Sequence, residues 1–567
     1  MVFLRPLAAV AAIGLAPLGV AGPPIDLGEK NADTPGAPHY TNASVLMPDG
    51  GLESFFRVGL KEGITFFRTR STDDGRTWSE KEKVIMPPKD DWGGPMPLLD
   101  RDGELHFIIP KLRGAGNRKP AEDLFVDLFH MRSSHGRTQW TDPQRIFEGY
   151  VGSFQGFIQL KNGRIVAPFG AWQAGVPVAP PFGSNVTTSV YSDDRGATWK
   201  QSSAKLVAPC PENTNGNCYG AVEPTLIELR DGRVWMLIRT ETGFLYESYS
   251  ADGAEWSSAQ PSRFHSSHSP AFLLRLRDGR LVNFWNNCEA APRVGRDGVY
   301  TGRDALHAAI SADDGKTWSG FREVYRDATR NGSPPKDGDR GTSYPSAAET
   351  HDGKILLVSG QGANRRRRFL IDPDWLMEKS QSENFENLDT WHLFKGIGQP
   401  ARYWRDRVQG PQIIAHPDKP GAKVLRVCRP DENDADGATW NFPAAMGGEL
   451  TLRLRVEKNS GGAQISLTDR MFEPCDDHGE KLAAFAVTIA PDGRIAEGVM
   501  LPPGQWHTLR LAWDGGACTA TLDGAAHTAL AARAQSPDGL SYLRLRSLAT
   551  AVDTAGFLIE SISMKAK

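Results

Sequence analysis

The chain has 567 residues, more than one hydrophobic core usually organises, so the sequence predicts at least two domains. Its 65 Lys and Arg residues nearly balance its 68 Asp and Glu residues, which leaves a formal net charge of -3. This balance excludes a strong overall field for nucleic acid or for an anionic membrane surface, so any recognition of charge must be local.

The first 21 residues have the features of a secretory signal. Arg5 precedes an apolar stretch that is too short to span a bilayer, and Gly19 and Ala21 have the spacing that signal peptidase prefers. No later stretch of the sequence approaches the roughly 20 apolar residues of a membrane helix. The sequence therefore predicts removal of residues 1–21 and a secreted mature protein without a membrane span.

A motif of the form Ser-x-Asp-x-Gly-x-Thr-Trp recurs along the chain about every sixty residues. Full copies are STDDGRTW at 71–78, SDDRGATW at 192–199 and SADDGKTW at 311–318, and weaker copies lie at 133–140 and 250–256. An alternating run precedes each copy and an extended segment follows it, which predicts a turn between two strands. Ser and Asp can bond backbone donors within the turn, Gly supplies a positive φ, and Trp fills the adjacent apolar gap.

A second pair of predicted strands lies upstream of most of these turns. The two strands are joined by Asp-Gly or Asn-Gly, as in TLIELRDGRVWMLIRT and AFLLRLRDGRLVNFWNN, and such dipeptides between apolar runs are strong hairpin signals. Each unit is thus a four-stranded meander, and radial repetition of such units is a β-propeller. Five turns and a final hairpin at 346–359 predict six blades over about residues 35–378, in a first domain that spans 22–378.

Two of the six cysteines, Cys210 and Cys218, flank a polar loop and can close it as a local disulfide. The other four lack metal-ligand spacing and are expected to be buried thiols: Cys288, Cys428, Cys475 and Cys518. Three histidines without a partner at such spacing are expected to be structural: His39, His265 and His268. We expect neither a metal nor a cofactor.

The sixty-residue period ends near residue 379, which marks the predicted domain boundary. Alternating runs such as ELTLRLRVE and QWHTLRLAWDGGACTATLDG follow, so residues 379–567 are predicted to form a second all-β unit, a β-sandwich. The second run resembles the hairpins of laminin-G and concanavalin-like lectin sandwiches. That resemblance covers little more than one hairpin, and it allows either sugar binding or support of the propeller.

The repeated turn is identified as the Asp box of the sialidase superfamily, and the propeller resembles that family over nearly its whole length. The box specifies a fold and not an activity, because it also occurs in non-hydrolytic proteins. In a four-stranded meander, the start of strand one, the end of strand two and the loop between strands two and three share one face of the disc. The Asp boxes lie on the other face, so the site is expected opposite them.

That rule selects four residues of blades four to six: Glu223, Arg239, Arg303 and Tyr344. The resemblance implies a Tyr344 nucleophile, Glu223 as its base, and Arg239 and Arg303 as two members of an arginine triad that binds the substrate carboxylate. Two guanidiniums bind a carboxylate bidentately, and a Tyr activated by Glu attacks an anomeric centre without the repulsion that an Asp would meet there. Glycosidases of this kind depart from the two-carboxylate scheme.

Two parts of the family pattern are absent from the sequence. Thr41 or Asn42 stands where the family has its first triad arginine, and the blade-six strand that would end in Tyr-Glu reads ILLVSGQG. Loss of the arginine together with its carboxylate partner avoids an unpaired charge, so we expect altered specificity. The general acid is left open among Glu62, Asp90 and Asp91. Other residues expected at the same mouth are Arg57, Asp91, Trp92, Gln155, Trp172, His265, His268 and the run NRRRR at 364–368.

The sequence therefore predicts a secreted sialidase-like exo-glycosidase that hydrolyses a terminal acidic sugar, sialic acid or a related one, from glycans by a retaining mechanism with a Tyr nucleophile. Its expected partners are glycan or glycoconjugate substrates, and neither nucleic acid nor a membrane span. One alternative is a polysaccharide lyase acting on uronate-containing glycans, although such propellers tend to carry Tyr where this chain has Glu223. The other is a glycan-binding protein without catalysis, which the missing arginine favours.

Overall fold

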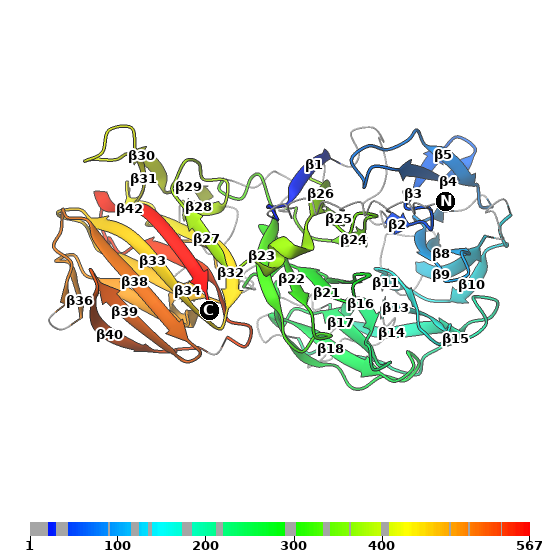
Figure 1. The fold of residues 1–567 in the computed structure, drawn as a ribbon. Coiled ribbons are helices and arrows are strands. Elements are labelled where there is room, and N and C mark those ends of the chain that lie inside the picture. The colour runs from blue at the N-terminus through cyan, green and yellow to red at the C-terminus, as the bar shows by residue number, and fades with distance from the viewer. Residues whose placement is uncertain are drawn as a thin grey trace, which may run out of the picture.

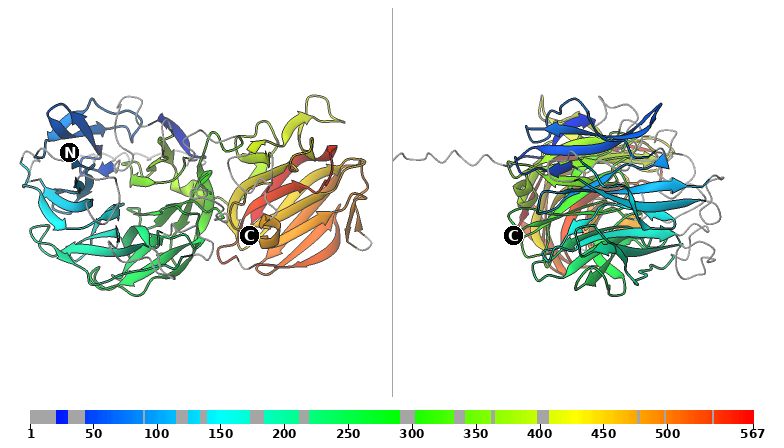
Figure 2. Two further views of the ribbon diagram at one scale, coloured as in Figure 1. Left: turned by 180° about the vertical axis from the view of Figure 1, so that it is seen from behind. Right: turned by 90° about the vertical axis from the view of Figure 1, so that its right-hand side faces the viewer.

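Figure 1 shows two all-β bodies in the computed structural model, a disc of radially arranged sheets and a sandwich of two sheets. The view from behind in Figure 2 shows the same two bodies joined along one side of the disc. The helical elements of the described residues are the 3₁₀ turn Pro373–Met377 and the short α1 (His478–Leu482). The structure describes residues 21–29, 44–88, 91–114, 124–133, 139–172, 184–210, 219–289, 302–332, 341–361, 365–397, 407–475, 478–496, 499–534 and 536–567.

Six antiparallel sheets make up the disc within these residues, and in the first five the strands follow one another in the chain, as the repeat predicts. Blade one contains β2 (Ser44–Leu46), β3 (Leu52–Leu60), β4 (Gly63–Ser71) and β5 (Glu82–Ile85). Blade two contains β6 (Asp91–Trp92), β7 (Met96–Leu99), β8 (Leu105–Arg113), β9 (Phe125–Arg132) and β10 (Gln144–Phe147). Blade three contains β11 (Val151–Ser153), β12 (Ile158–Gln159), β13 (Ile165–Trp172), β14 (Asn185–Ser192) and β15 (Lys200–Gln201). Blade four contains β16 (Val222–Glu228), β17 (Val234–Arg239), β18 (Phe244–Ser250) and β19 (Gln260–His265). Blade five contains β20 (Phe272–Arg275), β21 (Leu281–Trp285), β22 (Ala305–Ser311) and β23 (Ser319–Arg326). Blade six contains β24 (Ser346–Glu349), β25 (Ile355–Ser359) and β26 (Arg367–Ile371).

The sixth blade takes its outermost strand from the other end of the domain. β1 (Ile25–Glu29) pairs antiparallel with β26, and Arg367 Nε donates to Asp26 Oδ2 at 2.8 Å. The first and last strands of the disc thus close the ring by hydrogen bonds. The blades predicted to begin at about residue 35 do not include this strand, because five residues, IDLGE, are too few for a period to be recognised in the sequence.

The Asp boxes form the turn geometry that the sequence predicts. In the box at 71–78, Ser71 Oγ accepts from Gly75 N at 2.8 Å, and Asp73 accepts from the backbone N and the hydroxyl of Thr77 at 2.8 and 2.6 Å. Trp78 Nε1 donates to Gly75 O at 3.0 Å, and Gly75 has a φ of 88°. The box at 311–318 repeats this pattern. Each box is therefore a self-contained hydrogen-bonded turn between strands.

The innermost strands of the blades surround a channel of about 410 Å³. It is lined by residues of β2, β7, β12, β16, β20 and β24, which come from all six blades. Glu223 and Tyr344 precede the lining residues Thr225 and Ala347 of their own blades by two and three positions. These two candidate residues therefore lie toward one end of the channel.

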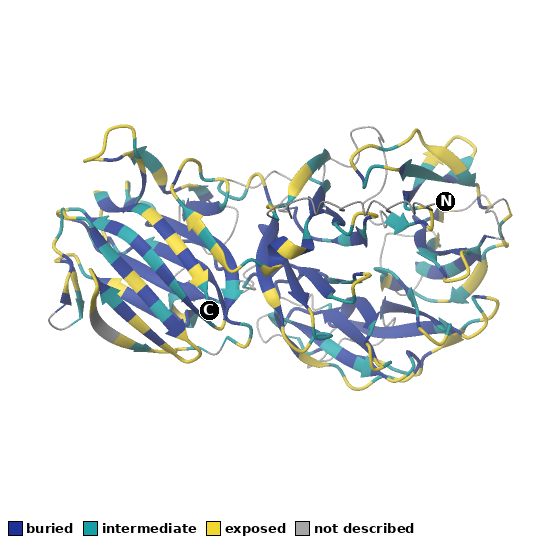
Figure 3. Ribbon diagram, viewed as in Figure 1, coloured by how far each residue is buried: buried dark blue, intermediate teal, exposed yellow. Residues whose placement is uncertain are grey.

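The C-terminal part of the chain packs two sheets around one apolar core. One sheet has the order β30-β31-β42-β33-β38-β39-β40 with β27 beside β42, and the other has the order β29-β28-β32-β41-β34-β35. Figure 3 shows buried residues alternating with more accessible ones along these strands, and in β33 buried and intermediate residues alternate. The strands are β27 (Ser380–Glu383), β28 (Trp391–Gly396), β29 (Arg407–Gln409), β30 (Gln412–Ala415), β31 (Lys423–Arg429), β32 (Gly437–Ala445), β33 (Gly447–Val456), β34 (Ala463–Thr468), β35 (Phe485–Ile489), β36 (Arg494–Ala496), β37 (Val499–Met500), β38 (His507–Asp514), β39 (Ala517–Leu522), β40 (Ala525–Ala531), β41 (Leu540–Ser547) and β42 (Asp553–Ala566).

Four cysteines are buried and free, as predicted: Cys288, Cys428, Cys475 and Cys518. Cys210 is disulfide-bonded, and its predicted partner Cys218 lies outside the described residues. Residues 1–20 of the predicted signal also lie outside them. Of the helices that the structure describes, none is long and apolar enough to cross a membrane.

Asp436 of the sandwich is expected to make stability depend on pH. Its side chain is buried and accepts from Cys428 N at 3.2 Å, and burial raises the pKa of Asp436 from 3.8 to about 6. Between these values the folded chain holds a proton that the unfolded chain has released, so stability falls as pH rises from about 4 to about 6 and then levels off. Asp436→Asn removes this contribution, so the free energy of unfolding of the variant relative to wild type should rise by roughly 2 kcal/mol across that window.

Chemical denaturation at pH 4, 5 and 7 measures this difference. Asp492→Asn serves as the control, because the Asp492 side chain is 59% exposed. A difference between Asp436→Asn and wild type that stays constant with pH would contradict the assignment.

Candidate active site

Glu223, Arg239 and Tyr344 form a closed set of contacts at the mouth of the disc. Arg239 Nη1 pairs with Glu223 Oε2 and donates to the Tyr344 hydroxyl at 3.1 Å. That hydroxyl donates to Glu223 Oε1 at 3.1 Å. Three side chains from blades four and six, up to 121 positions apart in the chain, therefore meet as the rule about the shared face of the blades predicts.

Two of these residues have a left-handed backbone. The φ of Glu223 is 49° and that of Tyr344 is 64°, a conformation that costs a non-glycine residue on the order of 1 kcal/mol or more. Glu223 lies where the pairing of β16 with β17 is irregular, between Val222 and Thr225, and its N–H donates to Ser153 Oγ at 2.7 Å. Such strain concentrates at functional sites, where the surrounding structure imposes it.

Arg303 approaches the same tyrosine from blade five. Its guanidinium lies 5.6 Å from the centroid of the Tyr344 ring, within the range of a cation–π contact. The side chain is buried, with Nη1 donating to Gln361 Oε1 and Nη2 to His268 O, both at 2.7 Å. All four residues that the sequence selects are therefore in one place, with Arg239 at the Tyr344 hydroxyl and Arg303 against its ring.

Burial and the charge of Glu223 keep the Tyr344 hydroxyl neutral at physiological pH. Burial, followed by the negative charge of Glu223, raises the pKa of Tyr344 to about 12, although Arg239 and Arg303 act in the opposite direction. Burial alone would lower the pKa of Arg239, but Glu223 and Tyr344 outweigh it and raise that pKa. The site therefore presents a neutral phenol that donates to a carboxylate, beside two cations.

The residues predicted from blades one and two lie differently. Glu62 is exposed in the hairpin between β3 and β4, Asp91 is exposed at the start of β6, and Asp90 lies outside the described residues. Arg57 Nη1 donates to Trp92 O at 2.6 Å. The substrate contact predicted for Trp92 gives way to a structural role, because its ring is 2% exposed and packs edge-on against Phe129. The roles of Glu62, Asp91 and Arg57 stay predictions.

Two residues of the predicted mouth have structural partners. His268 Nε2 lies 3.1 Å from Glu241 Oε1 and its ring stacks on Tyr219, and its structural role stays a prediction. His265 packs against Phe244 with ring centroids 4.3 Å apart, and burial lowers the pKa of His265 to about 4.

The arginine run at 364–368 belongs to blade six. Arg366 is buried and donates to Gly360 O at 3.2 Å, while Arg367 lies in β26 and pairs with Asp26 of β1. The run is therefore built into the fold and is not a solvated edge. Gln155 and Trp172 are half-buried, whereas Asn364, His39, Thr41 and Asn42 lie outside the described residues.

Two residues that contact the site, Ser153 and Gln361, are not among those predicted from the sequence. Ser153 ends the first strand segment of blade three, and Gln361 follows the second strand of blade six. The rule about the shared face of the blades, applied to every blade, would have found both.

A cluster of potential metal ligands lies in blade two, away from these residues. One ligand atom from each of Asp100, Glu104 and His106 falls within 4.8 Å of the others. Arg195 lies 3.4 Å from the Asp100 carboxylate and 3.3 Å from that of Glu104. Because a guanidinium already neutralises these carboxylates, the cluster joins blade two to the Asp box of blade three as an ion-pair network.

Comparison with known proteins gives three kinds of similarity. A model of the BNR repeat-like domain family matches residues 51–357. A sialidase from Micromonospora viridifaciens is 27% identical over 366 residues, which is 55% of this chain and 52% of the relative, so the chain spans about half the length of the curated relative it matches. Two solved structures superpose loosely, both with a TM-score of 0.41. Trypanosoma rangeli sialidase is 12% identical, and the superposition covers 93% of this chain and 91% of that chain. A protein of unknown function from Dyadobacter fermentans is 18% identical, and the superposition covers 59% of this chain and 97% of that chain.

The match to the family model extends over more than half of the chain and includes Glu223, Arg239, Arg303 and Tyr344. The chain belongs to the BNR repeat-like domain family and is a divergent member of the sialidase superfamily.

Proposed function

We propose that the protein is a sialidase-like exo-glycosidase that hydrolyses a terminal acidic sugar from glycans. The observation that carries this proposal is the contact of the Tyr344 hydroxyl with both Glu223 and Arg239, with Arg303 against the tyrosine ring. The similarity to a bacterial sialidase over 366 residues supports the same chemistry.

In the first step, the Tyr344 oxygen attacks the anomeric carbon of the terminal sugar. Its proton passes to Glu223 Oε1, to which the hydroxyl already donates, while the glycosidic bond breaks. The departing oxygen takes a proton from a general acid, for which Glu62, Asp90 and Asp91 stay the candidates. Water then attacks the same carbon and gives its proton to the conjugate base of that acid, and the Tyr344 oxygen leaves and recovers its proton from Glu223. Two displacements at one carbon retain its configuration.

The positive charge of Arg239 and Arg303, both buried beside Tyr344, attracts the acidic group of the substrate. Arg239 Nε is buried without a hydrogen-bond partner among the described residues, so this cation has donor capacity beyond its bonds to Glu223 and Tyr344. The raised pKa of Tyr344 keeps the nucleophile uncharged until its proton moves, so it does not repel an anionic substrate. Because the position of the third triad arginine holds Thr41 or Asn42, the preferred sugar is expected to differ from the family's usual one.

A substrate panel tests this proposal. Purified protein is offered fluorogenic sialosides, related nonulosonates and uronides, with Glu223→Gln as the control for contaminating hydrolases. Release of the fluorophore by wild type and not by the variant is the expected result. An ultraviolet-absorbing unsaturated uronate would instead identify a polysaccharide lyase, and binding across a glycan panel without release would identify a binding protein.

Export of the protein follows from the predicted signal and is a proposal as well. Expression with the full leader is expected to give a mature chain that begins at Gly22, which N-terminal sequencing of the material outside the cytoplasm measures. Recovery of the chain only inside the cell and with Met1 intact would contradict it.

A further inference from the structure

The sandwich reaches the end of the second strand of blade five, close to the mouth. Met471 N donates to Asn287 O at 3.0 Å, and Glu289 N donates to Met471 O at 2.8 Å, which forms a parallel bridge between Cys288 and Met471. Asn287 Nδ2 donates to Asp469 O at 3.0 Å. Arg470 Nε pairs with Glu289 Oε2 at 2.5 Å. Backbone, amide and ion-pair contacts thus tie residues 287–289 to the segment Asp469–Met471 of the sandwich.

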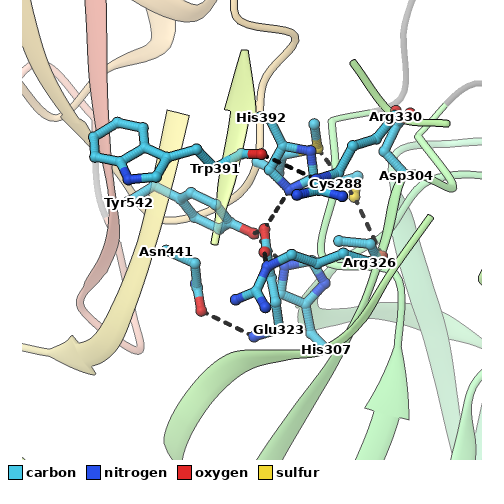
Figure 4. A network of polar contacts seen from close by, with 12 residues as sticks. Cys288, Asp304, His307, Glu323, Arg326, Arg330, Trp391, His392, Asn441 and Tyr542 are labelled. Atoms are coloured by element: carbon cyan, nitrogen blue, oxygen red, sulfur yellow. Dashed lines mark hydrogen bonds and ion pairs between the residues drawn. The ribbon is translucent and has the colours of Figure 1, made fainter. Parts of the chain in front are cut away.

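A buried polar network also contacts this strand end, and Figure 4 shows its members His307, Tyr542, Glu323 and His392. His307 Nδ1 accepts from Asn287 N at 3.0 Å, so the neutral ring carries its proton on Nε2, which contacts the Tyr542 hydroxyl. Tyr542 belongs to the sandwich and donates to Glu323 Oε1 of blade five at 2.6 Å. His392 Nε2 contacts the same carboxylate oxygen at 2.8 Å. Because all these side chains are buried and bonded to one another, the network holds the backbone of Asn287 in a fixed position.

The neighbouring residue Asn286 connects this strand end to Tyr344. Its side chain is fully buried, with Nδ2 donating to Ala305 O at 2.6 Å and to Thr342 Oγ1 at 2.9 Å. Its Oδ1 accepts from Ser343 Oγ at 2.9 Å. Thr342 Oγ1 in turn donates to Arg303 O at 2.7 Å. One amide therefore holds both residues that precede Tyr344 and, through Thr342, the backbone of Arg303.

We propose that Asn286 is a positioning residue for Tyr344 and Arg303, and that the sandwich holds Asn286 in place through Asp469–Met471. The catalytic part of this inference rests on the proposed function. The left-handed φ of Tyr344 is maintained only where its surroundings impose it, and two of the three hydrogen bonds of Asn286, those with Thr342 and Ser343, act on the segment that leads into it. The C-terminal domain is then part of the scaffold of the reaction centre and not a separable sugar-binding module.

Asn286→Ala tests the first half of this inference, with Asn283→Ala as its matched control. Asn283 lies in β21, three positions before Asn286, is equally buried, and its amide has no hydrogen-bond partner in the described part of the chain. Displacement of a reacting group by about 1 Å costs roughly a hundredfold in rate, so Asn286→Ala is expected to lower kcat roughly 10- to 100-fold with little change in KM. Asn283→Ala is expected to lose thermal stability while keeping kcat. Equal losses of kcat in the two variants, or a wild-type kcat in Asn286→Ala, would overturn the proposal.

Arg470→Met tests the second half, with Arg263→Met as its matched control. Both arginines make ion pairs between the two domains, Arg470 with Glu289 and Arg263 with Asp538, but only Arg470 holds the strand end beside Asn286. In the full-length chain, Arg470→Met is expected to lower kcat several-fold and Arg263→Met to leave it unchanged. Identical kcat values in the two variants would show that the sandwich does not hold Asn286 in place.

Crystal structures of the alanine variants separate this inference from the proposed function. If wild type turns over no substrate of the panel, the proposed function fails, but the position of Tyr344 can still be observed. In Asn286→Ala the Tyr344 hydroxyl is expected to move out of hydrogen-bond distance of Glu223 Oε1, whereas in Asn283→Ala it stays. A Tyr344 that keeps its left-handed φ and its bond to Glu223 in Asn286→Ala would overturn the positioning role, whatever the activity.

Discussion

Replacing Tyr344 with phenylalanine is expected to lower turnover roughly a thousandfold or more and to leave the fold intact. The phenylalanine ring keeps the packing against Arg303 and lacks only the hydroxyl that contacts Glu223 and Arg239. Without that oxygen no covalent intermediate can form, while the positive charge of the two arginines beside the substrate is unchanged. The loss should therefore appear in kcat, with KM close to that of wild type.

Tyr249→Phe is the matched control for this experiment. The Tyr249 hydroxyl also donates to a glutamate, Glu247 Oε2 at 3.2 Å, but it lies at the end of strand three beside an Asp box, on the opposite face of the disc. Full activity of Tyr249→Phe shows that loss of a Tyr–Glu hydrogen bond in the propeller is not enough to stop turnover. Activity of Tyr344→Phe near the wild-type level, in a protein with unchanged circular dichroism, would refute the role of the tyrosine.

Glu223→Gln is expected to reduce kcat about 10²- to 10⁴-fold, because an amide cannot take the Tyr344 proton. It should also lower the free energy of unfolding. The Arg239 guanidinium is 4% exposed and pairs with Glu223, and removal of one partner of a buried ion pair costs about 3–5 kcal/mol. Activity and stability are thus expected to fall together, and steady-state kinetics and chemical denaturation at neutral pH measure both.

Glu247→Gln controls for the chemistry of this substitution in the same blade. Glu247 accepts from Trp235 Nε1 at 2.9 Å and from Tyr249, and it has no arginine partner in the described structure. We expect it to keep wild-type kcat and to lose less stability than Glu223→Gln. A Glu223→Gln variant that unfolds at the same denaturant concentration as wild type would show that Arg239 does not depend on this carboxylate.

Local patterns in the sequence predicted much of the propeller. The Asp boxes at 71–78 and 311–318 carry their own hydrogen-bond partners, so their turn geometry is encoded within eight residues. Their spacing sets the blades, and the pleat of a meander decides which strand ends share a face. That is why Glu223, Arg239, Arg303 and Tyr344 could be selected together without knowledge of any contact between them.

Burial and the partners of the other mouth residues could not be predicted in the same way. Trp92 occupies a strand start on the correct face, yet its indole ring turns into the blade-two core. A strand period distinguishes the two faces of a sheet, but it does not tell whether a neighbouring blade covers a given side chain. β1 could not be predicted for a related reason, since its partner strand β26 lies at the other end of the domain.

By itself, then, the sequence determined the repeat, the turns, the two all-β domains and the face on which the candidate site lies, because each depends on short-range periodicity and local hydrogen bonding. Only the tertiary structure decided that Asn286 holds Thr342 and Ser343, and that the sandwich holds Asn287 from a residue 182 positions away. Such long-range contacts produce no repeating pattern in the sequence. They arise when separately patterned elements pack together and their buried polar groups must find partners in one another.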